Sequence, residues 1–490
     1  GLLAILFLTL LTLGFLAMYR QRTVLFLFLR QNWKNVLTAE LIGLFCFAFF
    51  LYVRWLNPDL WHPYHGGEKP MDFAYLNAMI KSSTFPAYDP WFSGGYINYY
   101  YFGMVIAGMP IKLLGIDPAI AVNIVLPLWF SMIAMGAYSL GSNLSKLSLK
   151  MRLSAQRLQN WARISGILAV ILVLLIGNLG TVRLLQETAR TMGAQGQDPA
   201  SAGYFANLGF LARGAVMILQ GEPLPLYPGT WYWNPSRTIA GSPITEFPLF
   251  TFLYADPHAH LYAMPFVLLA VAWALNTLYF EENKKLQAVK SVVYLALGGL
   301  LIGVLKPLNT WDFYTLFALG ASALLYRLLS DAEDLPGLKR MKIWPHRLLV
   351  ALGAFSLLFI TSQLMLHAFN SYFHPAFNQI AFWKDAKTTI REYLTHWGFF
   401  IFIMVWWYAW ETYKWLAATR LSALQKWAPY KKQILTLLIL AALIALVLGL
   451  LMGVRVAFIV IPLGLLTLAL VLRPGLTKAE RFAFFLAGTA

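Results

Sequence analysis

The chain has 490 residues, of which 59% are hydrophobic and 12% are charged. A soluble globular chain carries about 25% charged residues, so the composition excludes a soluble protein. Several runs exceed the ~18 apolar residues of a spanning helix, which predicts an all-α, polytopic membrane protein. The net charge of +17 does not indicate nucleic acid, because the basic residues fall between the hydrophobic runs, without interleaved aromatic patches. Cys46 is the one cysteine, which excludes an intramolecular disulfide and a cysteine-ligated metal.

We expect about twelve membrane-spanning helices in a single transmembrane domain over residues 1–490. In chain order they lie near residues 2–18, 36–53, 119–141, 164–181, 259–280, 289–305, 312–329, 348–368, 397–416, 434–452 and 457–472, and a further one begins at 482. The sequence begins without Met and stops inside an apolar run, so we expect a fragment of a longer protein.

Segment 99–116 is apolar, and its role follows from the sidedness of the loops. If it crossed the membrane, the basic loops would fall on both sides. If it only dips into or lies along the membrane, every basic loop falls on one side, as the positive-inside rule requires. We therefore expect segment 99–116 to be re-entrant or interfacial. The long loops 54–118, 182–258 and 369–396 then face the outside.

The first external loop contains a predicted amphipathic helix. It begins after Pro70, runs through MDFAYLNAMIKS and ends before the Phe85-Pro86 step. Glu68 and Asp72 lie four residues apart and share one face if the chain is helical. They are either solvated acids that stabilise the helix start through its dipole, or acidic residues of a functional site.

The order of features in this loop favours a functional site. An acid near the start is followed by the amphipathic helix, an F-P step, a DPWFSGG turn and a tyrosine-rich segment entering the membrane. This order resembles the first external loop of the GT-C membrane glycosyltransferases, which use polyprenyl-phosphate sugars. The resemblance implies a GT-C-like fold, with Asp72 as the catalytic acidic residue, Glu68 as its neighbour and segment 99–116 as a helix on the membrane.

Three stretches are similar to the motifs of an uncharacterised prokaryotic membrane-protein family known for its triple tyrosine: INYYYFG (97–103), EFPLFTFLYADPHAH (246–260) and LNTWDF (308–313). The resemblance covers the N-terminal two thirds of the chain. It implies a prokaryotic plasma membrane with extracytoplasmic long loops, and no function. The family shows an Asp-x-His-x-His stretch, which Asp256, His258 and His260 keep. Here Pro follows the Asp and Ala separates the histidines, where the family has an apolar residue and Pro.

The YADPHAH stretch supports two interpretations. Pro257 suits the first turn of a helix with Asp256 as its N-cap, and the histidines would then be interfacial side chains that reach water. Alternatively, Asp256, His258 and His260 supply oxygen and nitrogen ligands for a divalent metal such as Mg, Mn or Zn. Such a metal, near Asp72, would neutralise a departing lipid phosphate. Asp72 or a histidine could also act as a general base.

The turn KPLNTWDF (306–313) is a candidate substrate-binding element. Lys306 lies at an external helix end, close in sequence to Asn309 and Asp312. Lys306 either contacts a phosphate as a point charge, or it snorkels to water or pairs with Asp312.

Arg237 and a run of tyrosines complete the candidate substrate-binding set. Arg237, in WYWNPSRT, is a candidate phosphate ligand beside aromatic rings that could stack on a sugar, and Glu246 could join the metal ligands. Three further residues either anchor the chain at the membrane interface or line a groove for lipid or sugar: Tyr99, Tyr100 and Tyr101.

These observations predict a membrane glycosyltransferase that moves a sugar from a polyprenyl-phosphate donor to an unknown acceptor at the extracytoplasmic face. No phosphate-binding Gly-rich loop, Rossmann fingerprint or nucleophile elbow occurs in the sequence. One alternative is a multi-span transporter or lipid flippase, which needs ionisable residues along a membrane path. The other is a non-catalytic membrane scaffold, against which a clustering of Asp72, Asp256 and Lys306 around one cavity would argue.

Overall fold

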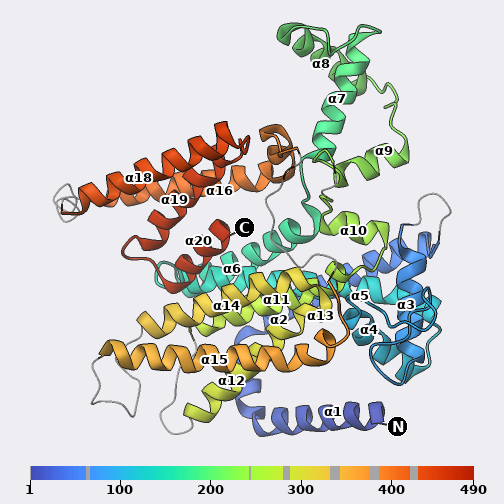
Figure 1. Cartoon of the computed structure of the whole chain (residues 1–490), viewed down its shortest axis with the longest axis vertical. Coiled ribbons are helices and arrows are strands. Elements are labelled where there is room, and N and C mark those ends of the chain that lie inside the picture. The colour runs from blue at the N-terminus through green and yellow to red at the C-terminus, as the bar shows by residue number, and fades with distance from the viewer. Residues whose placement is uncertain are drawn as a thin grey trace. The chain divides into compact units, whose positions relative to one another are not determined.

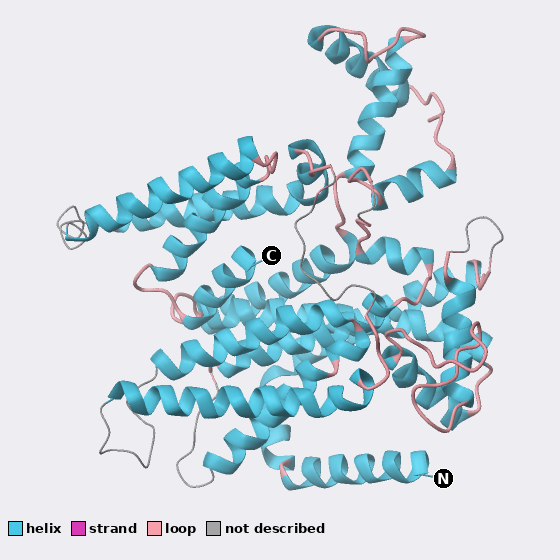
Figure 2. Cartoon of the chain, viewed as in Figure 1, coloured by secondary structure: helices cyan, strands magenta, loops and turns pink. Residues whose placement is uncertain are grey.

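The computed structural model describes residues 2–61, 67–241, 244–279, 287–330, 343–375, 384, 386–419 and 429–489. Helices dominate these residues (Figures 1 and 2), and the β structure among them is one isolated bridge between Tyr88 and Tyr96. The all-α prediction is confirmed. The chain divides into two compact units: unit 1 is residues 1–175 with 251–379, and unit 2 is residues 176–250 with 380–490. The single transmembrane domain over 1–490 stays a prediction.

Unit 1 is built from a series of helices. They are α1 (Leu2–Arg20), α2 (Arg22–Leu56), α3 (Lys69–Lys81), α4 (Phe102–Leu114), α5 (Pro118–Leu149), α6 (Ala155–Val170) with a π-helical end (Ile171–Leu175), α11 (Ala259–Thr277), α12 (Gln287–Gly303), α13 (Leu305–Leu308), α14 (Thr310–Ser330) and α15 (Ile343–Asn370). Several of them pack against helices distant in sequence, such as α2 against α5, α12 against α15 and α11 against α14. The short helix α10 (Pro248–Tyr254) lies at the boundary between the two units.

Unit 2 contains two helical groups. The first is α7 (Gly180–Ala194), α8 (Tyr204–Leu219), α9 (Pro228–Trp233) and a 3-10 turn (Asn234–Ser236); the second is α16 (Ile390–Ala418), α18 (Lys431–Leu446) with a π-helical end (Val447–Leu451), α19 (Ala457–Leu472) and α20 (Lys478–Thr489). The predicted external loop 182–258 is therefore largely helical.

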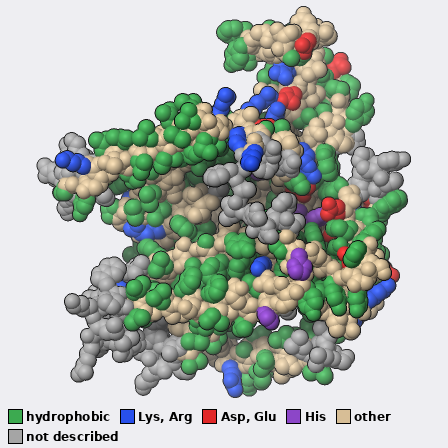
Figure 3. Space-filling model, viewed as in Figure 1, with side chains coloured by type: hydrophobic (Ala, Val, Ile, Leu, Met, Phe, Trp, Pro, Cys, Tyr) green, Lys and Arg blue, Asp and Glu red, His purple; other side chains and the backbone are tan. Residues whose placement is uncertain are grey.

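Among the described residues, seven helical segments are long and apolar enough to cross a membrane. They are Arg22–Leu56, Pro118–Leu149, Ala155–Leu175, Ala259–Thr277, Val289–Leu308, Arg347–Leu364 and Lys432–Leu451. Hydrophobic side chains cover large parts of the surface in Figure 3, as expected where lipid replaces water. The helical, polytopic character is thus confirmed. Helices α14 and α16 cover the expected spans 312–329 and 397–416, although neither is among the seven.

Two predicted boundaries were wrong. Residues 22–35 were expected in a loop but form the first part of α2, because apolar residues such as those in VLFLFL continue the helix between the charges. The span expected at 164–181 ends at Leu175, since the chain leaves the helix there before α7 begins at Gly180.

The two helices expected in the first external loop are present. Helix α3 begins at Lys69, just before the predicted start, with Pro70 in its first turn where a missing N–H costs nothing. Helix α4 has 13 residues, a length of about 20 Å. A hydrocarbon core of about 30 Å is too thick for it, which fits the expected re-entrant or interfacial segment 99–116.

Three clustered phenylalanines fix the position of α10. Phe50 of α2, Phe130 of α5 and Phe252 of α10 are all buried, with ring centroids 5.0 to 5.5 Å apart. Such a cluster removes large apolar areas from polar surroundings and adds edge-to-face ring contacts. The YADPHAH segment leaves α10 two residues after Phe252, so its starting point is held against α2 and α5.

Helix α4 approaches α11 closely at Gly103, the residue that follows YYYF. A Cβ at Gly103 would lie 2.3 Å from the Cβ of Tyr262. Tyr262 is itself buried, and its carbonyl accepts a hydrogen bond of 3.3 Å from the Trp129 indole of α5. The absence of a side chain at Gly103 therefore sets the spacing between α4 and α11.

Replacing Gly103 with Ala is expected to destabilise the protein by about 1–3 kcal/mol, because the new methyl must displace Tyr262 or α4. Thermal unfolding in detergent measures this. The matched control is Gly14→Ala in α1, where no atom lies within 4 Å of the added Cβ. That change should be neutral or stabilising by up to about 1 kcal/mol. Equal unfolding temperatures for the two variants would contradict the close approach.

Candidate functional site

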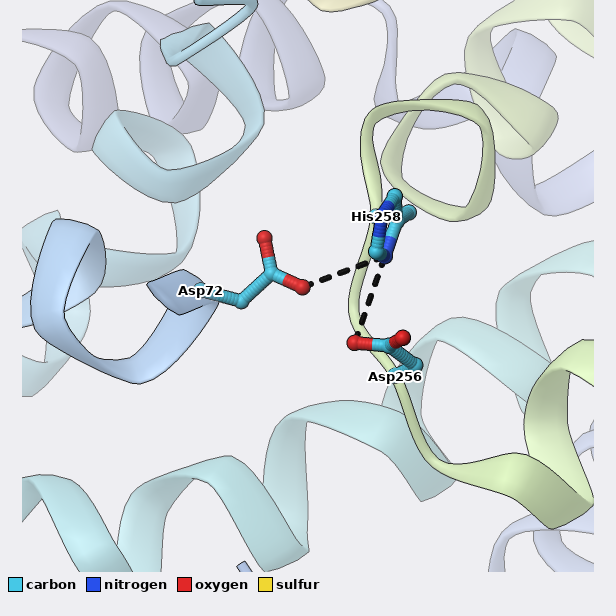
Figure 4. A group of neighbouring side chains, drawn as sticks. All are labelled: Asp72, Asp256 and His258. Atoms are coloured by element: carbon cyan, nitrogen blue, oxygen red, sulfur yellow. Dashed lines mark ion pairs between the residues drawn. The ribbon is translucent and has the colours of Figure 1, made fainter. Parts of the chain in front are cut away.

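Three ligand-type side chains from two distant parts of the sequence converge in unit 1. Asp72 lies in the first turn of α3, and Asp256 and His258 lie in the segment between α10 and α11. Figure 4 shows Asp72 pointing across to this segment, with the His258 ring between the two carboxylates. One ligand atom from each residue lies within 4.8 Å of the others, so the group could hold a metal ion.

His258 is the centre of the group. Its Nδ1 lies 3.1 Å from Asp72 Oδ2 and 3.2 Å from Asp256 Oδ1. Its Nε2 lies 2.7 Å from Glu68 Oε2. The Glu68 backbone N–H donates to the second oxygen of Asp256 at 3.3 Å. One imidazole is thus surrounded by three carboxylates, each within ion-pair distance.

Local backbone geometry places Asp256 and His258 on the same side of the chain. Ala255 has a φ of +57°, a left-handed conformation that ends α10 and turns the chain. The chain then makes a three-residue turn at Pro257, in which the His258 N–H donates to the Asp256 carbonyl at 2.8 Å. His258 itself is extended, and its ring lies beside the Asp256 carboxylate. A non-glycine residue in this conformation stores strain, which is most often found at functional sites.

The start of α3 is adapted to the same segment. Gly67 has a φ of +60°, and a Cβ there would lie 2.3 Å from the hydroxyl of Tyr254. Only glycine therefore fits this turn, which brings Glu68 and α3 against the end of α10.

Two expectations for YADPHAH were wrong. Helix α11 begins at Ala259 with His258 as the N-cap residue, so Asp256 does not cap it and Pro257 precedes it. His260 does not join the other two ligands. It lies in the first turn of α11, where its Nε2 is 3.2 Å from Thr251 Oγ1, because the helix turns its side chain away. Asp72 is instead the third possible metal ligand, beside Asp256 and His258.

The carboxylates of this group are buried without enough hydrogen-bond donors. The side chain of Asp72 is 0% exposed and that of Asp256 9%. Among the described residues, no donor in suitable geometry serves Asp72 Oδ1, Asp72 Oδ2 or Asp256 Oδ1. The single Nδ1–H of His258 is near two of these oxygens, but it is directed well at neither. Unsatisfied buried carboxylate oxygens are unfavourable unless a cation binds them.

The electrostatics of the group oppose ionisation of Asp72. Burial, against the opposing effect of His258 and together with nearby Asp256, raises the pKa of Asp72 to about 7. Burial also acts to raise the pKa of Asp256, but His258 and Asp72 outweigh it, and that pKa lies below its ordinary value. Burial acts to lower the pKa of His258, yet the two carboxylates raise it to about 11.

The stability of the metal-free protein is expected to fall as the pH rises from about 4 to about 7. Because the folded-state pKa of Asp72 is raised from 3.8 to about 7, its contribution is fully present below pH 3.8 and lost towards pH 7. The free energy of unfolding should fall by at most about 1.4 kcal/mol per pH unit. Thermal unfolding with a chelator measures it, and Asp72→Asn should reduce the slope. An identical pH dependence in both proteins would contradict the raised pKa.

Tyr99, the first residue of the triple tyrosine, lies beside the carboxylates. Burial and then the negative charges of Asp72, Glu68 and Asp256 raise its pKa. Its ring centroid is 6.0 Å from that of Tyr75 on α3. A neutral phenol next to three acids can donate a hydrogen bond to a ligand, so Tyr99 is better placed for binding than for anchoring alone.

The other two tyrosines face aromatic partners. The Tyr100 ring centroid lies 5.3 Å from that of Phe373, and the Tyr101 ring centroid lies 5.8 Å from that of Phe369. Tyr101 is buried, whereas Tyr100 is half-buried. Tyr101 is therefore part of the packing between the start of α4 and α15.

Lys69 is a residue of this site that the sequence analysis did not single out. It is buried, its Nζ lies 3.7 Å from Asp59 Oδ2 and it stands 5.5 Å above the Tyr254 ring. Arg54 of α2 donates to the carbonyl of Asp59 at 3.0 Å and to Asn123 at 2.9 Å. Burial lowers the pKa of Lys69, which Asp59 opposes. The adjacency of Lys69 to Glu68 was the only sequence signal for it.

The turn KPLNTWDF lies in the same unit. Helix α13, which carries Lys306, packs against α4 and α11. The Asn309 amide donates to Asp312 at 2.9 Å, so Asp312 pairs with Asn309 and makes no ion pair with Lys306. The three residues thus lie at helices that adjoin the site, and no contact joins them to the carboxylate group.

Arg237 and Glu246 belong to unit 2 and bind each other. Arg237 Nη1 lies 3.2 Å from Glu246 Oε1 and donates to the Ser236 carbonyl at 2.9 Å. The guanidinium stands 4.4 Å above the Trp233 ring. Stacking of the neighbouring aromatic rings on a sugar stays a prediction. Glu246 is thus engaged by Arg237. Both residues are described within unit 2 only, so their use as ligands of the group in unit 1 stays a prediction.

Comparison with known proteins identifies the family of the chain. A family model described as an uncharacterized membrane protein family, DUF2298, matches residues 1–490. No curated protein and no solved structure matches the chain. Because the match extends over the whole sequence, the chain belongs to the DUF2298 family of membrane proteins.

Proposed function

We propose that the protein is a membrane glycosyltransferase of the GT-C kind that transfers a sugar from a polyprenyl-phosphate donor to an acceptor at the extracytoplasmic face. The observation that carries this proposal is the convergence of Asp72, Asp256 and His258, with buried carboxylate oxygens that no donor in the described part of the chain satisfies. Such a group suits a divalent cation, and a cation can stabilise the negative charge of a departing lipid phosphate.

The ligand set favours a cation of intermediate softness. Two carboxylates and one imidazole supply two negative charges and a mixed oxygen and nitrogen environment. Mn²⁺ and Zn²⁺ accept imidazole more readily than Mg²⁺, which prefers oxygen and water. His258 would bind through Nδ1, and its Nε2–H would then donate to Glu68, 2.7 Å away. A carboxylate behind a histidine ligand orients the ring and raises its basicity.

The proposed reaction breaks the bond between the anomeric carbon and the phosphate oxygen. The acceptor hydroxyl attacks the anomeric carbon, the electron pair of the broken bond stays on the phosphate, and the hydroxyl proton passes to a base. The buried carboxylates would hold the cation, and Tyr99 would donate a hydrogen bond to the sugar or phosphate. Nearby Glu68, whose side chain is 60% exposed, is the accessible carboxylate for the proton.

A metal-independent variant of the same chemistry uses the group directly. With a pKa of about 7, Asp72 could accept the proton of the hydroxyl at neutral pH. Protonated His258, with its pKa near 11, would supply the positive charge for the phosphate. The two variants differ in one measurable property, which is the dependence of transfer on added divalent cation.

The rival functions receive less support from the same geometry. The clustering of Asp72 with Asp256 argues against a scaffold, because two adjacent buried carboxylates lower stability when no metal is bound. Lys306, the third residue of the expected cluster, does not join them. A transporter or flippase would need ionisable side chains along a membrane path. In the seven helical segments that could cross a membrane, Glu40 of α2 is the one acidic residue described, whereas Glu68, Asp72 and Asp256 lie outside these segments.

A transfer assay tests the proposal. The purified full chain is placed in nanodiscs with a labelled polyprenyl-phosphate sugar and a panel of hydroxyl-bearing acceptors. Loss of label from the lipid is followed with Mn²⁺, Mg²⁺, Zn²⁺ or a chelator. Consumption of the donor that the cation accelerates is expected. The matched control is Asp117→Asn, which changes an acid at the N-cap of α5 and keeps a capping side chain. No donor consumption across a panel of sugars would reject the transferase.

A further inference from the structure

A cavity of about 380 Å³ lies in unit 2 between α7 and α8, the two helices labelled side by side in Figure 1. This volume falls in the range of small-ligand sites. Its wall is partly polar and partly apolar; the residues that matter here are Glu187, Arg190, Tyr204, Asn207, Leu208 and Arg391. None of them belongs to the carboxylate group of unit 1.

The charge balance of this cavity is positive. Glu187 Oε1 accepts from Arg183 Nε at 2.9 Å and from Arg391 Nη2 at 2.7 Å, so one carboxylate already neutralises two guanidinium groups in part. Arg190, one turn further along α7, has a buried Nε for which the described residues offer no acceptor. Arg190 therefore lines the cavity as a cation for which the described residues supply no acid in ion-pair contact.

Asn207 supplies a second polar atom without a hydrogen-bond partner among the described residues, in this case an acceptor. Its Nδ2 donates to the carbonyls of Pro199 at 3.0 Å and Ala202 at 2.9 Å, which fixes the orientation of the amide. Its Oδ1 is then left buried with no donor among the described residues. A buried carbonyl oxygen in this state favours a ligand that brings a hydroxyl or N–H group.

We propose that this cavity is a binding site for a sugar-sized molecule that carries a phosphate group. Arg190 binds the phosphate, because guanidinium matches its oxygens in charge and in fork geometry. Asn207 Oδ1 accepts from a sugar hydroxyl, and the faces of Tyr204 and Leu208 cover the apolar side of the ring. The site goes beyond the proposed transferase centre, and it stands or falls independently of it.

Binding measurements on the full chain test this site. The protein in phosphatidylcholine nanodiscs is titrated calorimetrically with glucose 1-phosphate and with inorganic phosphate. A second preparation contains phosphatidylinositol in the nanodisc, and glucose 1-phosphate is titrated into it. Saturable binding of glucose 1-phosphate supports the site with a soluble ligand. Binding that phosphatidylinositol abolishes supports the site with a lipid headgroup as its occupant.

Variants of Arg190 assign the binding to the cavity. Arg190→Gln should weaken glucose 1-phosphate binding by about tenfold or more, the loss expected for a charge-assisted hydrogen bond. Arg190→Lys keeps the positive charge but loses the forked guanidinium geometry, so its affinity for glucose 1-phosphate should fall by less. The control is Arg213→Gln on α8, whose guanidinium lies 5.2 Å from the Phe210 ring and does not line the cavity. Its affinity should equal that of the wild type.

Two results would overturn the assignment. One is the absence of binding by glucose 1-phosphate in phosphatidylcholine nanodiscs, joined by unchanged thermal stability when phosphatidylinositol is added. The other is equal affinity of the wild type, Arg190→Gln and Arg190→Lys. If Arg190→Gln does not fold, the comparison of Arg190→Lys with Arg213→Gln decides, since both retain most of the chain's charge. The transfer assay does not enter this test, so the two proposals fail separately.

Discussion

Replacing Asp72 with Asn is expected to reduce sugar transfer by about 10²–10⁴-fold, the range for loss of a group that positions a metal or moves a proton. The substitution keeps the shape of the side chain but removes the negative charge that a cation needs. It should also stabilise the metal-free protein at neutral pH, because one of two adjacent buried carboxylates is gone. A structural role for Asp72 predicts the opposite combination: lower stability with little change in transfer per folded molecule.

A graded comparison with Glu68 sharpens this expectation. Glu68 is largely exposed and touches the site through His258 Nε2. Glu68→Gln should cost about 10–100-fold in metal affinity or activity, as orienting partners of metal ligands do. Asp117→Asn should leave transfer unchanged. If Glu68→Gln and Asp72→Asn lose activity equally while both stay folded, Glu68 is the proton acceptor and not an orienting group.

The second large effect is expected for His258→Ala in the absence of metal. His258 supplies the positive charge that faces Asp72 and Asp256, at 3.1 and 3.2 Å. Its removal leaves two buried carboxylates without a counter-charge, which should destabilise the protein by about 3–5 kcal/mol. Thermal or denaturant unfolding in detergent with a chelator measures the change. An unfolding temperature equal to that of the wild type would contradict the ion-pair geometry.

A double substitution separates charge from packing in this experiment. If the loss in His258→Ala comes from repulsion between the carboxylates, adding Asp72→Asn should recover much of the stability. If it comes from the cavity left by the ring, the two effects should add. Adding Mn²⁺ provides a third arm, because a bound cation replaces the missing positive charge and stabilises the variant in proportion to occupancy.

Much of the fold was predictable because lipid imposes strong rules on sequence. Apolar runs of sufficient length, with few charges within them, indicated most of the long helices. The short α4 was recognisable from the sidedness of the basic loops rather than from its own composition. The continuation of α2 through residues 22–35 was not predictable in the same way, since scattered charges in a helix look like a loop between spans.

The sequence indicated most of the residues of the candidate site, but it did not indicate how they are arranged. Asp72 and the YADPHAH stretch both stood out as polar residues at the edges of apolar segments. Which of the two histidines joins Asp72 depends on whether the chain is extended or helical after Asp256. That is decided by the left-handed Ala255 and by Gly67 fitting under Tyr254. These are tertiary constraints, and no local pattern encodes them.

The burial of Lys69 could not be predicted from the sequence, for a different reason. A single lysine beside an acid at a helix start normally indicates a solvated charge. Here the packing of α3 buries it near Asp59 and Arg54. Arg54, whose guanidinium binds the carbonyl of the same Asp59, is fifteen residues earlier in the sequence and inside an apolar helix. Only the folded structure therefore brings Lys69 and Arg54 together.

Equilibrium binding of Mn²⁺ to the purified full chain tests most directly whether Asp72, Asp256 and His258 form a functional cation site. Calorimetry together with the electron paramagnetic resonance signal of free Mn²⁺ gives the number of ions bound. We expect a single saturable site in the wild type and in Asp117→Asn, with at least about a hundredfold weaker binding in Asp72→Asn. No saturable binding in the wild type, or equal binding in Asp72→Asn, would contradict this expectation.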